Sequence, residues 1–258
     1  MPRQTLEIAT PVLGVALIRL NRPKQLNAIN EVMRDEIAQT LASVAQDRSV
    51  HAVVITGAGR GFCSGIDIRD FGPGMLEASA PAIDRLRFQE AMAGLVRALA
   101  DLPQPVIAAI NGACVGAGLA LSLAADIRIA STAATFGNAA ILLGLSGAEM
   151  GMSYHLPRIV GAGVAADWML TGRTVTAEEA DRRGLVSQLV EPDELVERAI
   201  EIAGGVAGLA PLGVRLTKRA LQVNIAAAGL GPALELENRN QVLSHATDDA
   251  AARRATWS

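Results

Sequence analysis

Two continuous apolar runs, each followed closely by glycine, constrain the fold of this chain more than any other feature. They occupy residues 51–56, before Gly57, and residues 106–110, before Gly112. A strand that is apolar along its whole length has to be buried on both faces, which is typical of parallel sheets covered by helices on both sides. Parallel neighbours also need a long crossover connection, usually a helix. The two runs therefore predict an α/β fold of stacked strand, turn and helix units.

The segments around these runs have the spacing of helices and of an N-terminal strand hairpin. Apolar and polar residues alternate between Leu6 and Leu20, which predicts the hairpin. Helical spacing predicts one helix after an Asn30 N-cap and a second helix before Pro103. Their apolar faces are Met33, Ile37, Leu41 and Val44 in the first helix, and Phe88, Met92, Leu95 and Leu99 in the second. The glycine-rich residues 57–75 are expected to form a functional loop.

From about residue 193 onward the chain has helical patterns alone. Before that point, Thr176 with Glu179 three residues later forms a capping box that opens a helix. Pro211 suits the first position of a later helix. We therefore divide the chain into an α/β core over residues 1–195 and a C-terminal helical region over residues 196–258.

Composition excludes several classes of function. The formal net charge is −3 without a block of like charges, so we expect no nucleic-acid partner and no membrane partner. No apolar run reaches the roughly 18 residues of a membrane-spanning helix, and the first residues lack the apolar segment of a secretory signal. A cytoplasmic location is therefore expected. The two cysteines, Cys63 and Cys114, and the three histidines show no metal-ligand spacing, so no metal is expected.

The glycines that follow the first run also fit a competing interpretation. Residues 53–61 look, in isolation, like a dinucleotide-binding turn after a strand, but a lone glycine motif is weak evidence. In a short-chain dehydrogenase the turn would follow the first strand, and a Tyr-x-x-x-Lys pair would be present. Here a hairpin and a helix come first, and Tyr154 is followed by Arg158. This context disfavours hydride transfer with a nicotinamide cofactor.

Several short segments between Leu20 and Asp249 together carry a likeness to a known family. They are LNRPKQLNA at 20–28, FCSGIDI at 62–68, PVIAAING at 105–112, ADIR at 125–128, ILLGL at 141–145, and LTG at 170–172 with AEEA at 177–180. In these segments the chain resembles the crotonase, or enoyl-CoA hydratase/isomerase, family. The resemblance implies a spiral of ββα turns, C-terminal helices that build a homotrimer or a hexamer made of two trimers, and an acyl-CoA thioester as substrate. Coenzyme A is then part of the substrate, and no separate cofactor is expected.

The resemblance assigns a chemical task to the two glycine turns. The family's oxyanion donors correspond to the backbone N–H groups of Ile66 and Ala117. A thioester that gains or loses a group beside its carbonyl passes through an enolate, which each fixed donor stabilises by roughly 3 kcal/mol or more. Gly65, Gly116 and Gly118 let the main chain approach without a Cβ clash. For either turn alone, a tight strand-to-helix connection is the simpler interpretation. Because both turns and their flanking sequences match the family, the interpretation as oxyanion donors is favoured.

The same resemblance implies a set of substrate contacts. The loop over residues 66–69 would line the bent coenzyme, and the main chain near residues 63–64 would lie against its adenine. Two basic residues, Arg22 and Lys24, would contact phosphates. Solvated surface charge is the alternative for the basic pair. The expected substrate-binding residues are Arg22, Lys24, Cys63, Ser64, Asp67, Ile68, Arg69, Gly116 and Ala140. Asp67 has a second interpretation, in which it fixes its own loop.

The chain departs from the family pattern at two positions where hydratases hold glutamates, because these positions are Ala120 and Ala140. Proton transfer needs a titratable group within hydrogen-bond reach, so straight hydration is disfavoured. Glu149 stands nearby, where dienoyl-CoA isomerases and some other branches carry an aspartate. We expect Glu149 to act as base or acid at the acyl carbons, with a pKa raised by an apolar turn. The alternative is a helix-start glutamate that pairs with a neighbour such as Arg158.

These observations predict an acyl-CoA enzyme whose reaction runs through a thioester enolate held by Ile66 and Ala117, with Glu149 as the proton carrier. Isomerisation of a double bond, or another enolate reaction that needs one acid, fits the residues better than hydration does. The rival hypothesis is an acyl-CoA-binding protein that kept the pocket and lost the chemistry, since both hydratase glutamates are replaced by alanine.

Overall fold

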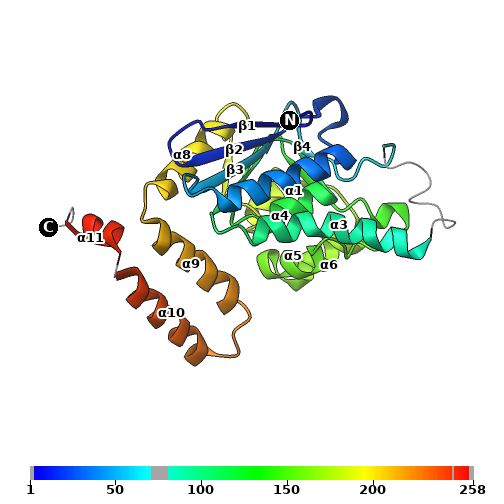
Figure 1. Ribbon diagram of the computed structural model, residues 1–258. Helices are drawn as coiled ribbons and strands as arrows, with labels where there is room; N and C mark the ends of the chain where they lie inside the picture. Colours follow the sequence, from blue (N-terminus) through cyan, green and yellow to red (C-terminus); the bar gives the residue numbers. More distant parts are fainter. Residues whose placement is uncertain (1–2, 71–80, 246, 256–258) are drawn as a thin grey trace.

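The computed structural model describes residues 3–70, 81–245 and 247–255, and it contains two sheets (Figure 1). The larger has six strands in the order β1-β2-β3-β5-β7-β10. In that order the strands are Leu6–Ala9, Val15–Leu20, Ala52–Gly57, Val106–Ile110, Ile127–Ser131 and Gln188–Val190. β1 and β2 form the antiparallel hairpin predicted from the sequence, and all other neighbours are parallel. The predicted loop over 57–75 extends beyond the described residues.

The smaller sheet has four strands in the order β4-β6-β8-β9. They are Gly61–Cys63, Ala113–Val115, Thr135–Gly137 and Val175–Thr176, with only β9 antiparallel to its neighbour. Three successive strand pairs, β3–β4, β5–β6 and β7–β8, each send their first strand into the larger sheet and their second into the smaller. Helices follow these pairs, so the structure has the repeating ββα spiral that the resemblance implied.

Helices cover both faces of the larger sheet. On one face lie α1 (Glu31–Gln46) and α3 (Ala82–Ala100), and on the other lies α8 (Leu195–Ala207). β3 shows why its sequence is apolar throughout, since Val53 and Ile55 belong to the first core and Ala52 and Val54 to the second. Successive side chains of a strand point to opposite faces. The expectation of a strand buried on both faces is confirmed.

Three predicted helix starts lie where the local sequence placed them. The side chain of Asn30 accepts a hydrogen bond from the N–H of Met33 at the start of α1. Thr176 does the same for Glu179 at the start of α7 (Ala177–Arg182). Pro211 occupies the first turn of α9 (Pro211–Asn224). The helices around the site are α4 (Ala117–Ala124), η2 (Ile141–Leu143), α5 (Met152–Val160) and α6 (Ala162–Thr171).

The C-terminal helices α9, α10 (Leu230–His245) and α11 (Asp248–Ala255) lie to one side of this body in Figure 1. An ion pair ties α9 to the core, because Nζ of the buried Lys218 lies 2.7 Å from Asp126 Oδ2 and donates to the carbonyl of Gln104 at 2.9 Å. Asp126 also accepts from the N–H of Val106 at 2.7 Å, so its role is structural. The division near residue 195 stays a prediction, and α8 packs with the core.

Within the described ranges, no single helix is both long and apolar enough to cross a membrane. The consecutive helices α8 and α9 meet those requirements only when taken together, and the chain bends by 108° between them.

Candidate active site

The two glycine turns meet in space. Gly65 has φ +106° and Gly116 has φ +54°, in the region that favours glycine. A Cβ atom on Gly65 would lie 3.3 Å from the carbonyl oxygen of Val115 and 3.7 Å from the amide nitrogen of Ala117. Gly118 is packed more tightly still, since a Cβ there would lie 2.1 Å from the carbonyl oxygen of Cys63. The absence of side chains at these positions allows β4 and the start of α4 to touch.

The amides of Ile66 and Ala117 are both unengaged at this contact. Their neighbours are not, because the N–H of Asp67 donates to Ile29 at 2.9 Å and the N–H of Gly116 donates to Gly137 at 3.0 Å. In the described ranges of the chain, neither Ile66 nor Ala117 donates its N–H to any acceptor. Ala117 is the first residue of α4, where amides lack a partner within the helix. The structure therefore leaves both predicted donors available.

Both residues line one cavity of about 410 Å³. Its walls come from the loop after β4, the start of α4, the segment around η2 and one end of α3. The lining is mostly apolar, as in small-molecule sites. The described lining residues are Ser64, Gly65, Ile66, Ile68, Arg85, Phe88, Gln89, Gly116, Ala117, Ala139, Ala140, Leu143, Leu145 and Glu149. Among them, Glu149 alone carries a carboxyl group.

Glu149 is held in a turn just before α5. Met150 and Gly151 have φ +46° and +79°, and the carbonyl of Glu149 accepts from the N–H of Met152 at 2.9 Å. The side chain is half-buried, and this burial raises the pKa of the Glu149 carboxyl, while a hydrogen bond from Gln89 acts in the opposite direction. The raised pKa agrees with the expectation from the sequence.

The alternative partner for Glu149 is engaged elsewhere. Arg158 lies over the ring of Tyr154, 3.7 Å from its centroid, and donates to the carbonyl of Tyr154 at 2.7 Å. In the part of the chain that the structure describes, Glu149 forms no ion pair. The expected alternative, a helix-start glutamate paired with Arg158, is not formed.

Arg22 and Asp67 lie outside the cavity lining and contact each other. The guanidinium of Arg22 lies 2.8 Å from Asp67 and 3.0 Å from Asp70, and it is largely buried. Asp67 also accepts from the N–H of Arg69 at 3.2 Å. These bonds support the interpretation in which Asp67 fixes its own loop. They also occupy the Arg22 guanidinium, which the sequence assigned to a phosphate.

Three further predicted contacts are also absent from the cavity lining. Lys24 lies exposed in η1 (Pro23–Gln25), and Arg69 is exposed in the loop after β4. The side chain of Cys63 is fully buried in the core, where burial raises the pKa of its thiol to about 12. Contact of these residues with coenzyme A stays a prediction. By contrast, Ser64, Ile68, Gly116 and Ala140 lie where the sequence placed them, in the lining.

The first part of α3 lies in the segment 71–90 that is expected from the sequence to shape the acyl pocket, but none of its residues was predicted individually. Arg85, Phe88 and Gln89 reach the lining from the first part of this helix. The signal was present, because Arg85 and Gln89 are four residues apart and Gln89 precedes Met92 by three, which places them on neighbouring positions of one face. The apolar face that predicted α3 already included Phe88 and Met92.

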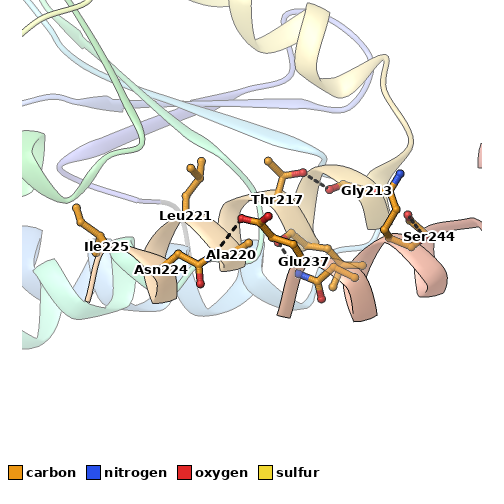
Figure 2. Close-up of a pocket in the computed structure, with 11 residues that line it drawn as sticks. Gly213, Thr217, Ala220, Leu221, Asn224, Ile225, Glu237 and Ser244 are labelled. Carbon is orange, nitrogen blue, oxygen red and sulfur yellow. Dashed lines mark hydrogen bonds between the residues drawn. The ribbon is translucent and has the colours of Figure 1, made fainter. Parts of the chain in front are cut away.

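A larger cavity, of about 710 Å³, lies between α9 and α10 (Figure 2). Its polar side chains are already paired locally, since Asn224 donates to Glu237 at 3.1 Å and Thr217 donates to the carbonyl of Gly213 at 2.8 Å. It is formed by one helical hairpin and includes neither glycine turn. We therefore place the candidate active site in the smaller cavity.

The ββα spiral and a cavity with two unengaged main-chain amides define the class of crotonase-fold enzymes that act on thioesters. A sequence model of the family described as enoyl-CoA hydratase/isomerase matches residues 12–255. The chain belongs to the enoyl-CoA hydratase/isomerase family and is an acyl-CoA enzyme of that family.

Known proteins of the family resemble the chain over most of its length. The probable enoyl-CoA hydratase echA12 of Mycobacterium leprae is 45% identical over 229 residues, which cover 88% of this chain and 78% of that protein. The structure of the enoyl-CoA hydratase from Bacillus anthracis matches with a TM-score of 0.92 at 32% identity, covering 98% of this chain and 96% of that one. A monofunctional enoyl-CoA isomerase from M. smegmatis matches with a TM-score of 0.76 at 39% identity, covering 90% and 99%.

Proposed function

We propose that this enzyme moves a double bond within an enoyl-CoA thioester, or catalyses another enolate reaction that needs a single acid–base group. One observation carries the proposal: among the described residues of the cavity that holds the Ile66 and Ala117 amides, Glu149 alone bears a carboxyl group. The positions of the usual hydratase glutamates hold no titratable side chain, since Ala140 lines the cavity and Ala120 is fully buried in α4. Activating a water while also delivering a proton would need a second such group.

The proposed reaction uses only groups of this chain. The amides of Ile66 and Ala117 donate to the thioester oxygen, and the ionised carboxyl of Glu149 removes a proton from an acyl carbon. The electron pair of that C–H bond moves onto the thioester oxygen as the double bond shifts, giving an enolate. Glu149 then returns its proton to a different carbon, and the enolate collapses to the isomeric thioester. No metal and no redox cofactor takes part in this scheme.

The relatives support two of the three candidate functions, isomerisation and hydration. The resemblance to the M. smegmatis isomerase supports movement of a double bond. The resemblance to the M. leprae and B. anthracis hydratases favours addition of water as the second candidate. A catalytically silent acyl-CoA-binding protein is the third, and it rests on the two alanines.

Three assays on the purified protein separate these candidates. We expect it to shift the double bond of a 3-enoyl-CoA or dienoyl-CoA thioester and to exchange an α-proton with D₂O. Hydration of crotonyl-CoA, followed by absorbance, is expected to be much slower. Fast hydration would refute the isomerase assignment. Tight binding of acyl-CoA without hydration, isomerisation or exchange would instead show a binding protein.

Replacing Gln89 with leucine should move the acidic limb of the pH–rate profile to higher pH. Glu149 must be ionised to accept a proton, and the hydrogen bond from Gln89 lowers the pKa that burial has raised. Removing that bond leaves the burial effect unopposed, so the pKa rises further and less base is present at acid pH. Glu90→Gln, an exposed change on the same helix outside the lining, is the matched control. An acidic limb that stays in place for Gln89→Leu would argue against this role.

The assembly expected from the resemblance also stays a proposal. We propose a homotrimer or a hexamer of two trimers, formed through the C-terminal helices. Large apolar side chains exposed on α9, at its C-terminal end and on α10 support it, among them Leu221 (70% exposed), Ile225 (60%) and Val242 (72%). Such side chains are normally covered in an assembly when they gather on one surface.

A further inference from the structure

Arg85 differs from the other arginines of α3. Arg87 lies 3.6 Å from Asp84, and Arg97 lies 3.3 Å from Asp101, so both have a carboxylate partner on the helix. The side chain of Arg85 forms no ion pair and no hydrogen bond within residues 3–70, 81–245 and 247–255. It is also the arginine of this helix that lines the active-site cavity. Its guanidinium is therefore available to a ligand in that cavity.

Among the described lining residues, none forms an ion pair with this charge. The lining around α3 is apolar, with Ile68, Phe88 and Leu145 among its residues. Among the described lining residues, Glu149 alone has a carboxyl group. It accepts a hydrogen bond from Gln89 and forms no ion pair with Arg85. A guanidinium presents a planar fork of donors that matches a carboxylate in bidentate geometry. An anionic group on the bound molecule would satisfy it.

The position of Arg85 on the helix indicates where that anion would lie. Arg85 precedes Gln89 by four residues, so the two side chains are neighbours on one face, about one helical turn apart. Gln89 contacts the carboxyl of Glu149, which in the proposed reaction lies beside the reacting acyl carbons. Because the two positions are about 5 Å apart along the helix axis, the long side chain of Arg85 can meet a group at the far end of a short acyl chain.

We propose that Arg85 binds a second carboxylate at the far end of the acyl group, and that the substrate is the mono-CoA thioester of a dicarboxylic acid. This inference rests on the proposed function, because it needs the acyl group to lie in this cavity. It makes Arg85 a specificity-determining residue, since its exposed guanidinium can form an ion pair with a terminal carboxylate but gains nothing from a plain fatty acyl group.

Calorimetric titration with saturated thioesters tests the inference without requiring turnover. The probes are pairs of equal chain length: succinyl-CoA with butyryl-CoA, glutaryl-CoA with valeryl-CoA, and adipyl-CoA with hexanoyl-CoA. We expect wild type to bind at least one dicarboxylic member about tenfold more tightly than its partner, as for a charge-assisted hydrogen bond. Arg85→Gln should abolish the preference while leaving the affinity for the plain ester unchanged. Arg87→Gln, which removes a neighbouring charge outside the lining, should keep the preference.

Two results would overturn the inference. One is a wild type without preference at any chain length. The other is an Arg85→Gln variant whose affinity for the plain ester falls below the wild-type value as much as its affinity for the dicarboxylic partner does, because Arg85 would then contact the coenzyme part that all probes share. Neither result affects the proposed function, which fails separately if no thioester binds or if no double bond moves in the assays described above.

Discussion

Glu149→Gln is expected to lower the rate of double-bond isomerisation by about 10²- to 10⁴-fold, the usual contribution of a positioned acid–base group. Glutamine keeps the size of the side chain and its ability to hydrogen-bond Gln89, but it cannot accept a proton from an acyl carbon. The amides of Ile66 and Ala117 are untouched, so acyl-CoA binding should change by no more than about twofold, on the order of an uncharged contact. Steady-state kinetics together with calorimetric binding measure the two effects separately.

The same substitution should not destabilise the protein near neutral pH. The pKa of Glu149 is raised in the folded state, so its contribution to stability is fully present below the unfolded-state pKa and is lost as pH rises through the folded-state pKa. A glutamine at this position carries no charge at any pH, so the variant does not lose this stability as the pH rises. The midpoint of thermal unfolding at pH 7 should therefore equal or exceed that of wild type. Glu90→Gln, which removes an exposed carboxylate, serves as the reference variant. Undiminished turnover in Glu149→Gln would remove Glu149 from the mechanism and leave the fold assignment intact.

Gly118→Ala is expected to abolish activity and to cost about 1–3 kcal/mol of stability or more, as overpacking in a core does. A Cβ at this position would lie 2.1 Å from the carbonyl oxygen of Cys63 and 2.8 Å from its Cβ atom. These atoms belong to the buried strand β4 and cannot rotate away. The start of α4 would have to separate from β4, and these two elements position the amides of Ala117 and Ile66.

Gly94→Ala is the matched control for that substitution. Gly94 lies inside α3, and a Cβ there would meet nothing within 4 Å. Alanine in a helix interior is favoured over glycine by roughly 0.5–1 kcal/mol. Denaturant unfolding should thus show Gly94→Ala more stable and Gly118→Ala less stable than wild type. Wild-type activity in Gly118→Ala would contradict the close approach of the two turns.

Much of the fold could be predicted because its signals are local. The apolar run that became β3, the Asn30 and Thr176 caps and the proline at the start of α9 act on residues next to them in the chain. The two glycine turns were predictable for the same reason, since a positive φ at Gly65 or Gly116 depends on the residue itself. The likeness to a family then related the two turns to each other.

Side-chain partners were less predictable, because they depend on how distant elements pack. Arg22 was assigned to a phosphate, yet its guanidinium contacts Asp67 and Asp70, more than forty residues further along the chain. Pairing of Glu149 with Arg158 was the alternative interpretation, and in the structure Arg158 instead lies over Tyr154 within its own helix. Both outcomes depend on the rotamer and the neighbours of one side chain, which no periodic pattern encodes.

The sequence by itself determined the hairpin, the apolar strands with the helices between them, the helix caps and the two glycine turns, because each follows from the conformational preferences of adjacent residues. Only the tertiary structure decided which side chains meet at the cavity. Gln89 reaches Glu149 across sixty residues of chain because α3 packs beside the turn before α5, and the same packing places Arg85 in the lining. Contacts of this kind are made by the packing of whole elements, and local preferences do not specify them.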